Sequence, residues 1–216
     1  MKTKMVGLVA VVMMTAVAAW AAGDTSALHP PPGSRIALVV FEDLECPACA
    51  HAEPLLEQAK RNYGLPLVRH DFIIPNHAWS MEAHIIARYF DTKSPQMGEE
   101  FRRYIFANQT AIFKANLREW GDKFATAHHT ALPAFYDPSG ALRAKVEADT
   151  QLGRVTGATG VLHTPTIYVV SDSTQEPFVE VTDQTKLFET IEQVKAALPP
   201  APTAKAKAKS KTAAQN

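Results

Sequence analysis

Short runs of hydrophobic residues alternate with longer segments of helical periodicity along this chain. Residues 36–41 read I-A-L-V-V-F, and a second apolar segment covers residues 67–73. A third run, at 166–171, is followed by a turn and then by residues 178–181, which predicts a hairpin. A continuous apolar run such as residues 36–41 is typical of a strand buried on both faces of a sheet.

Helical patterns occupy most of the remaining sequence. One helix is predicted over residues 47–63, ended by Gly64, and a last helix over residues 184–198. Four further helical segments lie between the second and third predicted strands, at 79–90, 96–109, 115–128 and 142–157. We therefore expect residues 77–160 to form one inserted helical block.

The two ends of the chain differ in composition from the middle. Residues 1–22 carry two early lysines, an apolar run and a small-residue cleavage pattern near Ala21, which predicts a signal peptide for export. A retained membrane anchor is the alternative, because the apolar run approaches the length of a spanning helix. Residues 23–34 form a short linker, and the Ala/Lys-rich tail at 199–216 is expected to be disordered.

The charge balance bears on the class of partner. The chain has 216 residues, 46% of them hydrophobic, with 22 basic and 22 acidic side chains, which excludes collagen-like and disordered classes. Six of the basic residues lie at the two ends without an acid, so the part between them carries a net charge of −6. Since a mildly acidic body offers no basic surface for phosphates, we expect no nucleic-acid partner.

The only two cysteines form a single C-P-A-C motif, with Pro47 and Ala48 between Cys46 and Cys49. A disulfide that closes so short a loop stabilises a fold little, so the pair indicates chemistry rather than a staple. Cys46 directly precedes a predicted helix, whose unpaired N–H groups and dipole favour a thiolate. Cys49 lies one turn further in, where it would resolve a mixed disulfide.

Acidic residues before the motif act against this thiolate. Glu42, Asp43 and Glu45 place negative charge in the sequence just before Cys46, and nearby negative charge raises the pKa of a thiol. The helix start has the opposite effect. The residues alone leave the net shift of the Cys46 pKa undecided.

Together these segments resemble a known family. The strand, F-E-D-L-E-C-P-A-C, the helical insertion and G-V-L-H-T-P-T resemble the DsbA-like thiol-disulfide oxidoreductases of the thioredoxin superfamily, in particular the BdbD-like branch. The resemblance covers nearly all of the mature chain. It rests on the pairing of C-P-A-C with Thr164-Pro165-Thr166, more than a hundred residues later. Further matching positions are Pro54, Phe106, Asn108 and Gln109.

The resemblance implies an α/β thioredoxin fold with an inserted helical subdomain. The thioredoxin-like domain would comprise residues 35–76 and 161–198, interrupted by the insertion at 77–160. Pro165 would be cis and pack against the cysteines, while the backbone of Thr164 would pair with an extended peptide. The activity implied is that of a protein-disulfide oxidoreductase without a cofactor.

The resemblance also bears on partners and on direction. Substrates would be reduced exported proteins, and a membrane partner of the DsbB or VKOR type would reoxidise the enzyme. Isomerases and reductases with this module resemble dimers with an added N-terminal domain, whereas only a short linker precedes the first strand here. We therefore expect a monomeric oxidase, with a reductase or isomerase as the alternative.

Two departures from the family pattern concern the active site. The strongest oxidants have a histidine between the cysteines, where this chain has Pro47 and Ala48. Many relatives hold a buried glutamate six residues before the first cysteine, where this chain has Val40. The second departure puts carboxylate-assisted proton transfer in doubt.

A metallochaperone is the competing function from another class. The two thiolates of C-x-x-C, joined by a histidine, would bind copper or zinc. The candidate histidines are His51, His70, His77 and His163. Because a second paired ligand motif is missing from the sequence, the redox function is favoured. A redox-inert binding protein is the third alternative.

Overall fold

The computed structural model describes residues 23–173 and 177–200. The predicted signal peptide, and all of the predicted tail after residue 200, therefore lie outside the described residues. The helices are α1 (Pro47–Tyr63), α2 (Ser80–Asp91), α3 (Pro95–Asn108), α4 (Leu117–Ala127), α5 (Ala141–Val155) and α6 (Leu187–Ala197), with short 3-10 helices η1 (Gln109–Ala111) and η2 (Gln184–Lys186). Among the described residues, we find no helix whose length and hydrophobicity would allow it to cross a membrane.

Four strands form one mixed sheet in the order β2-β1-β3-β4. β1 (Ile36–Glu42) is parallel to β2 (Leu67–Asp71), whereas β3 (Thr166–Ser171) is antiparallel to β1 and to β4 (Phe178–Glu180). All residues of β1 and β3 are buried, as their continuous apolar sequences predict. The two central strands are thus the one that precedes the cysteines and the one that follows Pro165.

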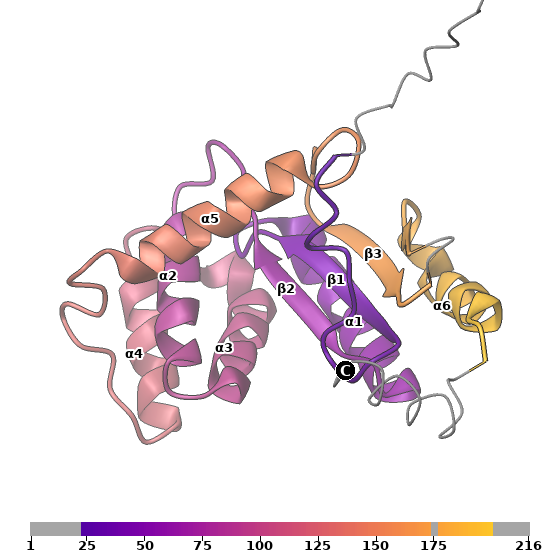
Figure 1. Cartoon of the computed structure of the whole chain (residues 1–216). Helices are drawn as coiled ribbons and strands as arrows, with labels where there is room; N and C mark the ends of the chain where they lie inside the picture. The colour runs from indigo at the N-terminus through magenta and orange to yellow at the C-terminus, as the bar shows by residue number, and fades with distance from the viewer. Residues whose placement is uncertain (1–22, 174–176, 201–216) are drawn as a thin grey trace, which may run out of the picture.

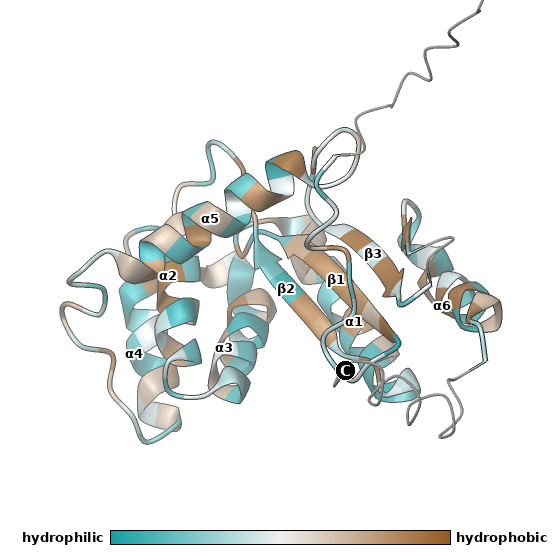
Figure 2. Cartoon of the chain, viewed as in Figure 1, coloured by the Kyte–Doolittle hydropathy of each residue, from teal (hydrophilic) through white to brown (hydrophobic). Residues whose placement is uncertain are grey.

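Different parts of the chain pack against the two faces of the sheet, which Figure 1 shows among the helices. Leu38 and Val40 of β1 pack with residues of α1 and α6 in one hydrophobic cluster, while Val39 and Phe41 pack with Phe72 and Tyr168 in another. Figure 2 shows β1 and β3 as predominantly hydrophobic strands between these layers. The alternation of side chains along a strand thereby buries both faces of β1.

The predicted helical insertion is confirmed, because α2, α3, α4 and α5 all lie between β2 and β3 in the sequence. Figure 1 shows α2, α3 and α4 grouped beside the sheet, with α5 running back toward β1. The rings of Phe90, Phe101 and Phe124 pack with centroids 4.9 to 5.1 Å apart. The same hydrophobic cluster includes Cys46 and Cys49, so the core of the insertion reaches the cysteine motif.

The helix boundaries follow local signals. α1 begins with Pro47 at its first turn and ends at Gly64, whose φ of 62° places it in the left-handed region. Ser94 caps α3 by accepting a hydrogen bond from the Met97 N–H. The predicted helix over 47–63 is therefore confirmed at both ends.

Several predicted boundaries differ from the structure by one to three residues, and two of them concern the ends of β2 and the last helix. β2 ends at Asp71 rather than at residue 73, because the Ile73 N–H donates to the Thr150 hydroxyl of α5 instead of to a strand. The last helix begins with the 3-10 turn η2, where the Asp183 carboxylate accepts from the Thr185 N–H, and α6 itself starts at Leu187. At the end of β2, a polar side chain thus takes a backbone N–H that the hydrophobic pattern assigns to a strand.

Gly153 of α5 allows this helix to lie directly on the sheet. A Cβ at this position would lie 2.5 Å from a ring atom of Phe72 and 3.0 Å from one of Phe41, and both rings are buried. We expect Gly153→Val to lower the free energy of unfolding by about 2 kcal/mol or more, because overpacking forces buried rings from their positions.

Urea denaturation of the purified variant measures this effect. Gln151→Val is the matched control, since Gln151 is an exposed residue of the same helix. Because valine favours a helix more than glycine does, helix propensity cannot cause a loss in Gly153→Val, and a stability equal to that of the unsubstituted protein would contradict the close approach.

Candidate active site

Cys46 is the N-cap residue of α1. Its backbone is extended, and its carbonyl oxygen accepts hydrogen bonds from the N–H groups of Cys49 and Ala50, which begin the helix. Cys46 and Cys49 are both free thiols, with exposed fractions of 8% and 2%. Pro47 and Ala48 between them are exposed, so solvent reaches the motif from the first turn of the helix.

The sheet brings the second predicted motif to the same place. Thr166 of β3 pairs with Phe41 of β1, so the loop before β3 lies beside the loop that follows β1. The Thr164–Pro165 peptide bond is cis. The Cys46 thiol lies 3.4 Å from the carbonyl oxygen of Thr164, a residue 118 positions away in the sequence, and donates a hydrogen bond to it.

This environment stabilises a thiolate on Cys46. A hydrogen bond from the Cys49 side chain has the largest effect and lowers the pKa of Cys46, whereas burial raises it. The Thr164 side chain and the N–H groups of Cys49 and Ala48 lower it further. Together these effects bring the pKa of Cys46 to about 5. The Thr164 hydroxyl is buried and has no hydrogen-bond partner in the described part of the chain, so it is free to donate to a thiolate on Cys46. Burial, followed by the bond to Cys46, raises the pKa of Cys49 far above its ordinary value.

The acidic residues before Cys46 turn away from it. Glu42 lies in an ion pair with Arg69 at 2.7 Å. The Asp43 carboxylate accepts from the Ile74 N–H and lies 2.9 Å from the His77 imidazole. Glu42 and Asp43 thus bind groups other than Cys46, and neither is among the main influences on the Cys46 pKa, which resolves the opposition that the sequence leaves open.

Glu45 completes this pattern. One of its carboxylate oxygens accepts from the N–H groups of Trp79 and Ser80, at 2.6 and 2.8 Å. These amides begin α2, so Glu45 caps that helix and interacts with the positive end of its dipole. Negative charge in the F-E-D-L-E segment therefore anchors the loop instead of repelling the thiolate.

Two side chains of the insertion hold the backbone of the same loop. The Leu44 N–H donates to His84 Nε2 at 3.0 Å. The Gln109 amide donates to the carbonyl oxygens of Leu44 and Cys46, at 2.9 and 3.1 Å. Sequence reasoning assigned no role to His84; its signal is a histidine within the apolar run A-H-I-I-A of a predicted helix.

A protein-family model matches most of this chain. Residues 32–192 match the family model described as Thioredoxin, which is more than half of the chain. The chain belongs to this thioredoxin family. A search among curated proteins finds no match.

Solved structures of DsbA type share the fold of this thioredoxin family member. The thiol-disulfide exchange protein alpha-DsbA2 from Wolbachia pipientis superposes with a TM-score of 0.58 at 15% identity, over 77% of this chain and 85% of the other. Proteus mirabilis ScsC gives 0.56 at 18% identity, over 76% and 85%. Pseudomonas aeruginosa DsbA2 gives 0.53 at 17% identity, over 79% and 94%. The predicted α/β thioredoxin fold with a helical insertion is confirmed.

The histidines of the metal alternative lie apart from one another in this thioredoxin fold. His51 and His163 are exposed, and the His163 imidazole lies 3.5 Å from the Thr166 hydroxyl. His70 contacts Asp149, and His77 contacts Asp43. Within residues 23–173 and 177–200, no group of three or more His, Cys, Asp or Glu side chains is arranged to hold a metal ion.

A buried carboxylate is present although Val40 replaces the glutamate of many relatives. Glu42 lies two residues further along β1, on the same face as Val40, and is 1% exposed. Burial, which outweighs the attraction of Arg69, raises the pKa of Glu42 to about 7. The charge of Glu42 also contributes to the raised pKa of Cys49.

Substitution of Cys49 tests the origin of the Cys46 pKa. We expect Cys49→Ala to raise the pKa of Cys46 by roughly one unit or more, because the strongest hydrogen bond to the thiolate is lost. The ultraviolet absorbance of the thiolate, followed as a function of pH, gives this value. Cys49→Ser is the matched control, since its hydroxyl still donates; equal titrations in both variants would contradict the assignment.

Glu42 makes stability depend on pH. Because the folded protein holds the Glu42 proton more tightly than the unfolded chain, stability from this group is present below pH 4.5 and is lost as the pH rises to about 7. We expect Glu42→Gln, which cannot ionise, to gain stability relative to the unsubstituted protein across this interval. Urea denaturation at several pH values measures the difference. The exposed Glu82→Gln serves as control, and a difference independent of pH for Glu42→Gln would refute the assignment.

Proposed function

We propose that this protein is an exported thiol-disulfide oxidoreductase that introduces disulfides into reduced exported proteins. The observation that carries the proposal is the contact of a low-pKa thiol, Cys46, with Thr164 of the loop that contains the cis-proline. A thiol with these properties is a good leaving group in thiol-disulfide exchange. The structural similarity to proteins of DsbA type supports the proposal at the level of the fold.

The reaction begins with the oxidised protein, in which Cys46 and Cys49 form a disulfide. A substrate thiolate attacks Cys46 Sγ; a bond forms between substrate and Cys46, and the Cys46–Cys49 bond breaks. The electron pair of that bond goes to Cys49, whose high pKa makes it take up a proton. A mixed disulfide between Cys46 and the substrate is the product.

A second substrate thiolate completes the exchange. It attacks the substrate sulfur of the mixed disulfide, forms the substrate disulfide and releases Cys46 as a thiolate. The substrate loses two electrons and the cysteine pair gains them. Because the pKa of Cys46 is about 5, the released sulfur stays ionised at neutral pH, which favours reduced enzyme and oxidised substrate.

The surroundings of the cysteines suit an extended peptide. Pro47 and Ala48 between the cysteines are exposed, and the backbone of Thr164 contacts the Cys46 sulfur. Main-chain hydrogen bonds to Thr164 would hold many sequences with little selectivity. The proposal also includes four properties predicted from the sequence. They are export, reoxidation by a membrane partner of the DsbB or VKOR type, a monomeric state and membership of the BdbD-like branch.

Redox equilibration and paired activity assays test the function. The mature protein is equilibrated with glutathione buffers, and its oxidation of a reduced substrate protein is compared with its reduction of insulin. We expect fast oxidation, weak insulin reduction, and loss of both activities in Cys46→Ser. Strong insulin reduction with weak oxidation would replace the oxidase by a reductase. Failure to exchange disulfides in either assay would favour a redox-inert binding protein.

A further inference from the structure

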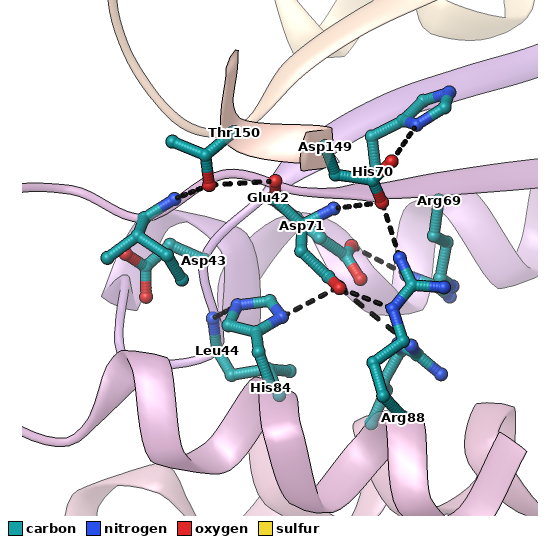
Figure 3. Close-up of polar contacts among 12 residues, drawn as sticks. Glu42, Asp43, Leu44, Arg69, His70, Asp71, His84, Arg88, Asp149 and Thr150 are labelled. Atoms are coloured by element: carbon teal, nitrogen blue, oxygen red, sulfur yellow. Dashed lines mark hydrogen bonds and ion pairs between the residues drawn. The ribbon is translucent and has the colours of Figure 1, made fainter. Parts of the chain in front are cut away.

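His84 connects a buried carboxylate to the loop that contains Cys46. It belongs to α2 and is fully buried. Figure 3 shows its ring between the Leu44 backbone nitrogen and the Asp71 carboxylate. The two ring nitrogens lie 3.0 Å from Leu44 N and 2.8 Å from Asp71 Oδ1, respectively.

The geometry fixes the protonation of this imidazole. A backbone N–H only donates, so His84 Nε2, opposite the Leu44 N–H, must be an unprotonated acceptor. The proton of the neutral ring is then on Nδ1 and is donated to Asp71. A protonated Nε2 would direct a hydrogen at the Leu44 N–H, and both the loop and α2 would have to move.

The surroundings of Asp71 keep it an ionised acceptor for the Nδ1–H group of His84. Burial alone would raise its pKa, but its contacts with His84, Arg102 and Arg88 outweigh burial and lower the pKa below the ordinary range. Arg88 Nε donates to the second carboxylate oxygen of Asp71, and Nη2 of the same guanidinium pairs with Asp149 of α5. The acceptor for His84 is therefore fixed by side chains from three helices.

We propose that His84, in the tautomer set by Asp71, is a positioning residue that holds the Leu44 to Cys46 loop in its redox-competent conformation. This inference rests on the proposed function. Leu44 lies two residues before Cys46; its N–H is bound by His84 and its carbonyl oxygen by Gln109, so both backbone polar groups of Leu44 depend on the insertion. The helical insertion thereby determines where Cys46 lies relative to Thr164.

A variant that removes the acceptor but keeps a planar ring tests this role. We expect His84→Phe to raise the pKa of Cys46 and to slow its alkylation by iodoacetamide at mildly acidic pH by roughly tenfold, because a loosened loop withdraws Cys46 from its hydrogen-bond donors. Cys49 does not interfere, since its raised pKa keeps it a thiol.

Thr150→Val is the matched control. Thr150 is also buried, and its hydrogen bonds go to the backbone of Ile73 and Asp71 rather than to the Leu44 to Cys46 loop. We expect Thr150→Val to lose stability, as His84→Phe does, while the titration of Cys46 stays unchanged. A folded His84→Phe that titrates like the unsubstituted protein would overturn the proposal, as would an equal shift of the Cys46 pKa in Thr150→Val.

Nuclear magnetic resonance of the unsubstituted protein gives an answer even where His84→Phe does not fold. The ring nitrogens of His84 should show a neutral Nδ1–H tautomer, with a scalar coupling across the hydrogen bond between Leu44 N and Nε2. An Nε2–H tautomer, or no coupling, would overturn the proposal. Because these readouts and the Cys46 titration use no protein substrate, they stand apart from the oxidation assay: a protein that meets them yet fails to exchange disulfides would refute the proposed function alone.

Discussion

The contact between Cys46 and Thr164 depends on the register of β1 and β3. The two residues are 118 positions apart, and the pairing of Phe41 with Thr166 is what brings their loops together. A slip of one residue would turn every side chain of a strand to the opposite face. Since both faces of β1 and β3 are buried, such a slip would disrupt two hydrophobic clusters at once. The packing of the sheet is thus what keeps a thiol against a distant loop.

A polar layer lies between this sheet and the insertion. Arg69 contacts Glu42 and Glu53, and Asp71 contacts His84 and Arg88, all of them buried or nearly so. Burying charge costs desolvation energy that pairing only partly offsets, so these groups are poor candidates for stabilising the fold by themselves. Through His84, which accepts from the Leu44 N–H, this layer supplies one partner for the backbone of a loop that belongs to no helix or strand. Glu42, Asp43 and Glu45 have partners of their own in the fold, and the pKa of Cys46 is low although they precede it in the sequence.

Hydrophobic patterns predicted most of the framework. The helix over residues 47–63 and the strand over 166–171 have clear local signals, namely Pro47 and Gly64 for the first and a continuous apolar run for the second. The end of β2 could not be predicted, because it depends on Thr150, which is distant in the sequence. Local patterns contain no information about such partners.

The same limit applies to the chemistry of the site. The C-P-A-C motif identified both sulfurs, but the direction of the Cys46 pKa shift depends on where the nearby carboxylates point. Asp43 reaches Ile74, and Glu45 reaches Trp79, 31 and 34 residues away. Charge counted along the sequence treats these groups as neighbours of the thiol, whereas in space their carboxylates are bound by backbone N–H groups between β2 and α2. His84 was missed for a related reason: one buried histidine in a helix has no local signature of what it binds.

The insertion is therefore part of the candidate active site rather than an addition to a complete thioredoxin unit. Glu45 caps α2, and Gln109 binds the Cys46 carbonyl oxygen from the end of α3. Both sulfurs lie in the hydrophobic cluster that contains Phe90 and Phe101. Because packed interiors transmit small displacements, a shift of α2 or α3 changes the surroundings of the thiolate directly. In the isolated sheet and α1, the loop before Cys46 would lack partners for several backbone groups, and the sulfur would lose its fixed position.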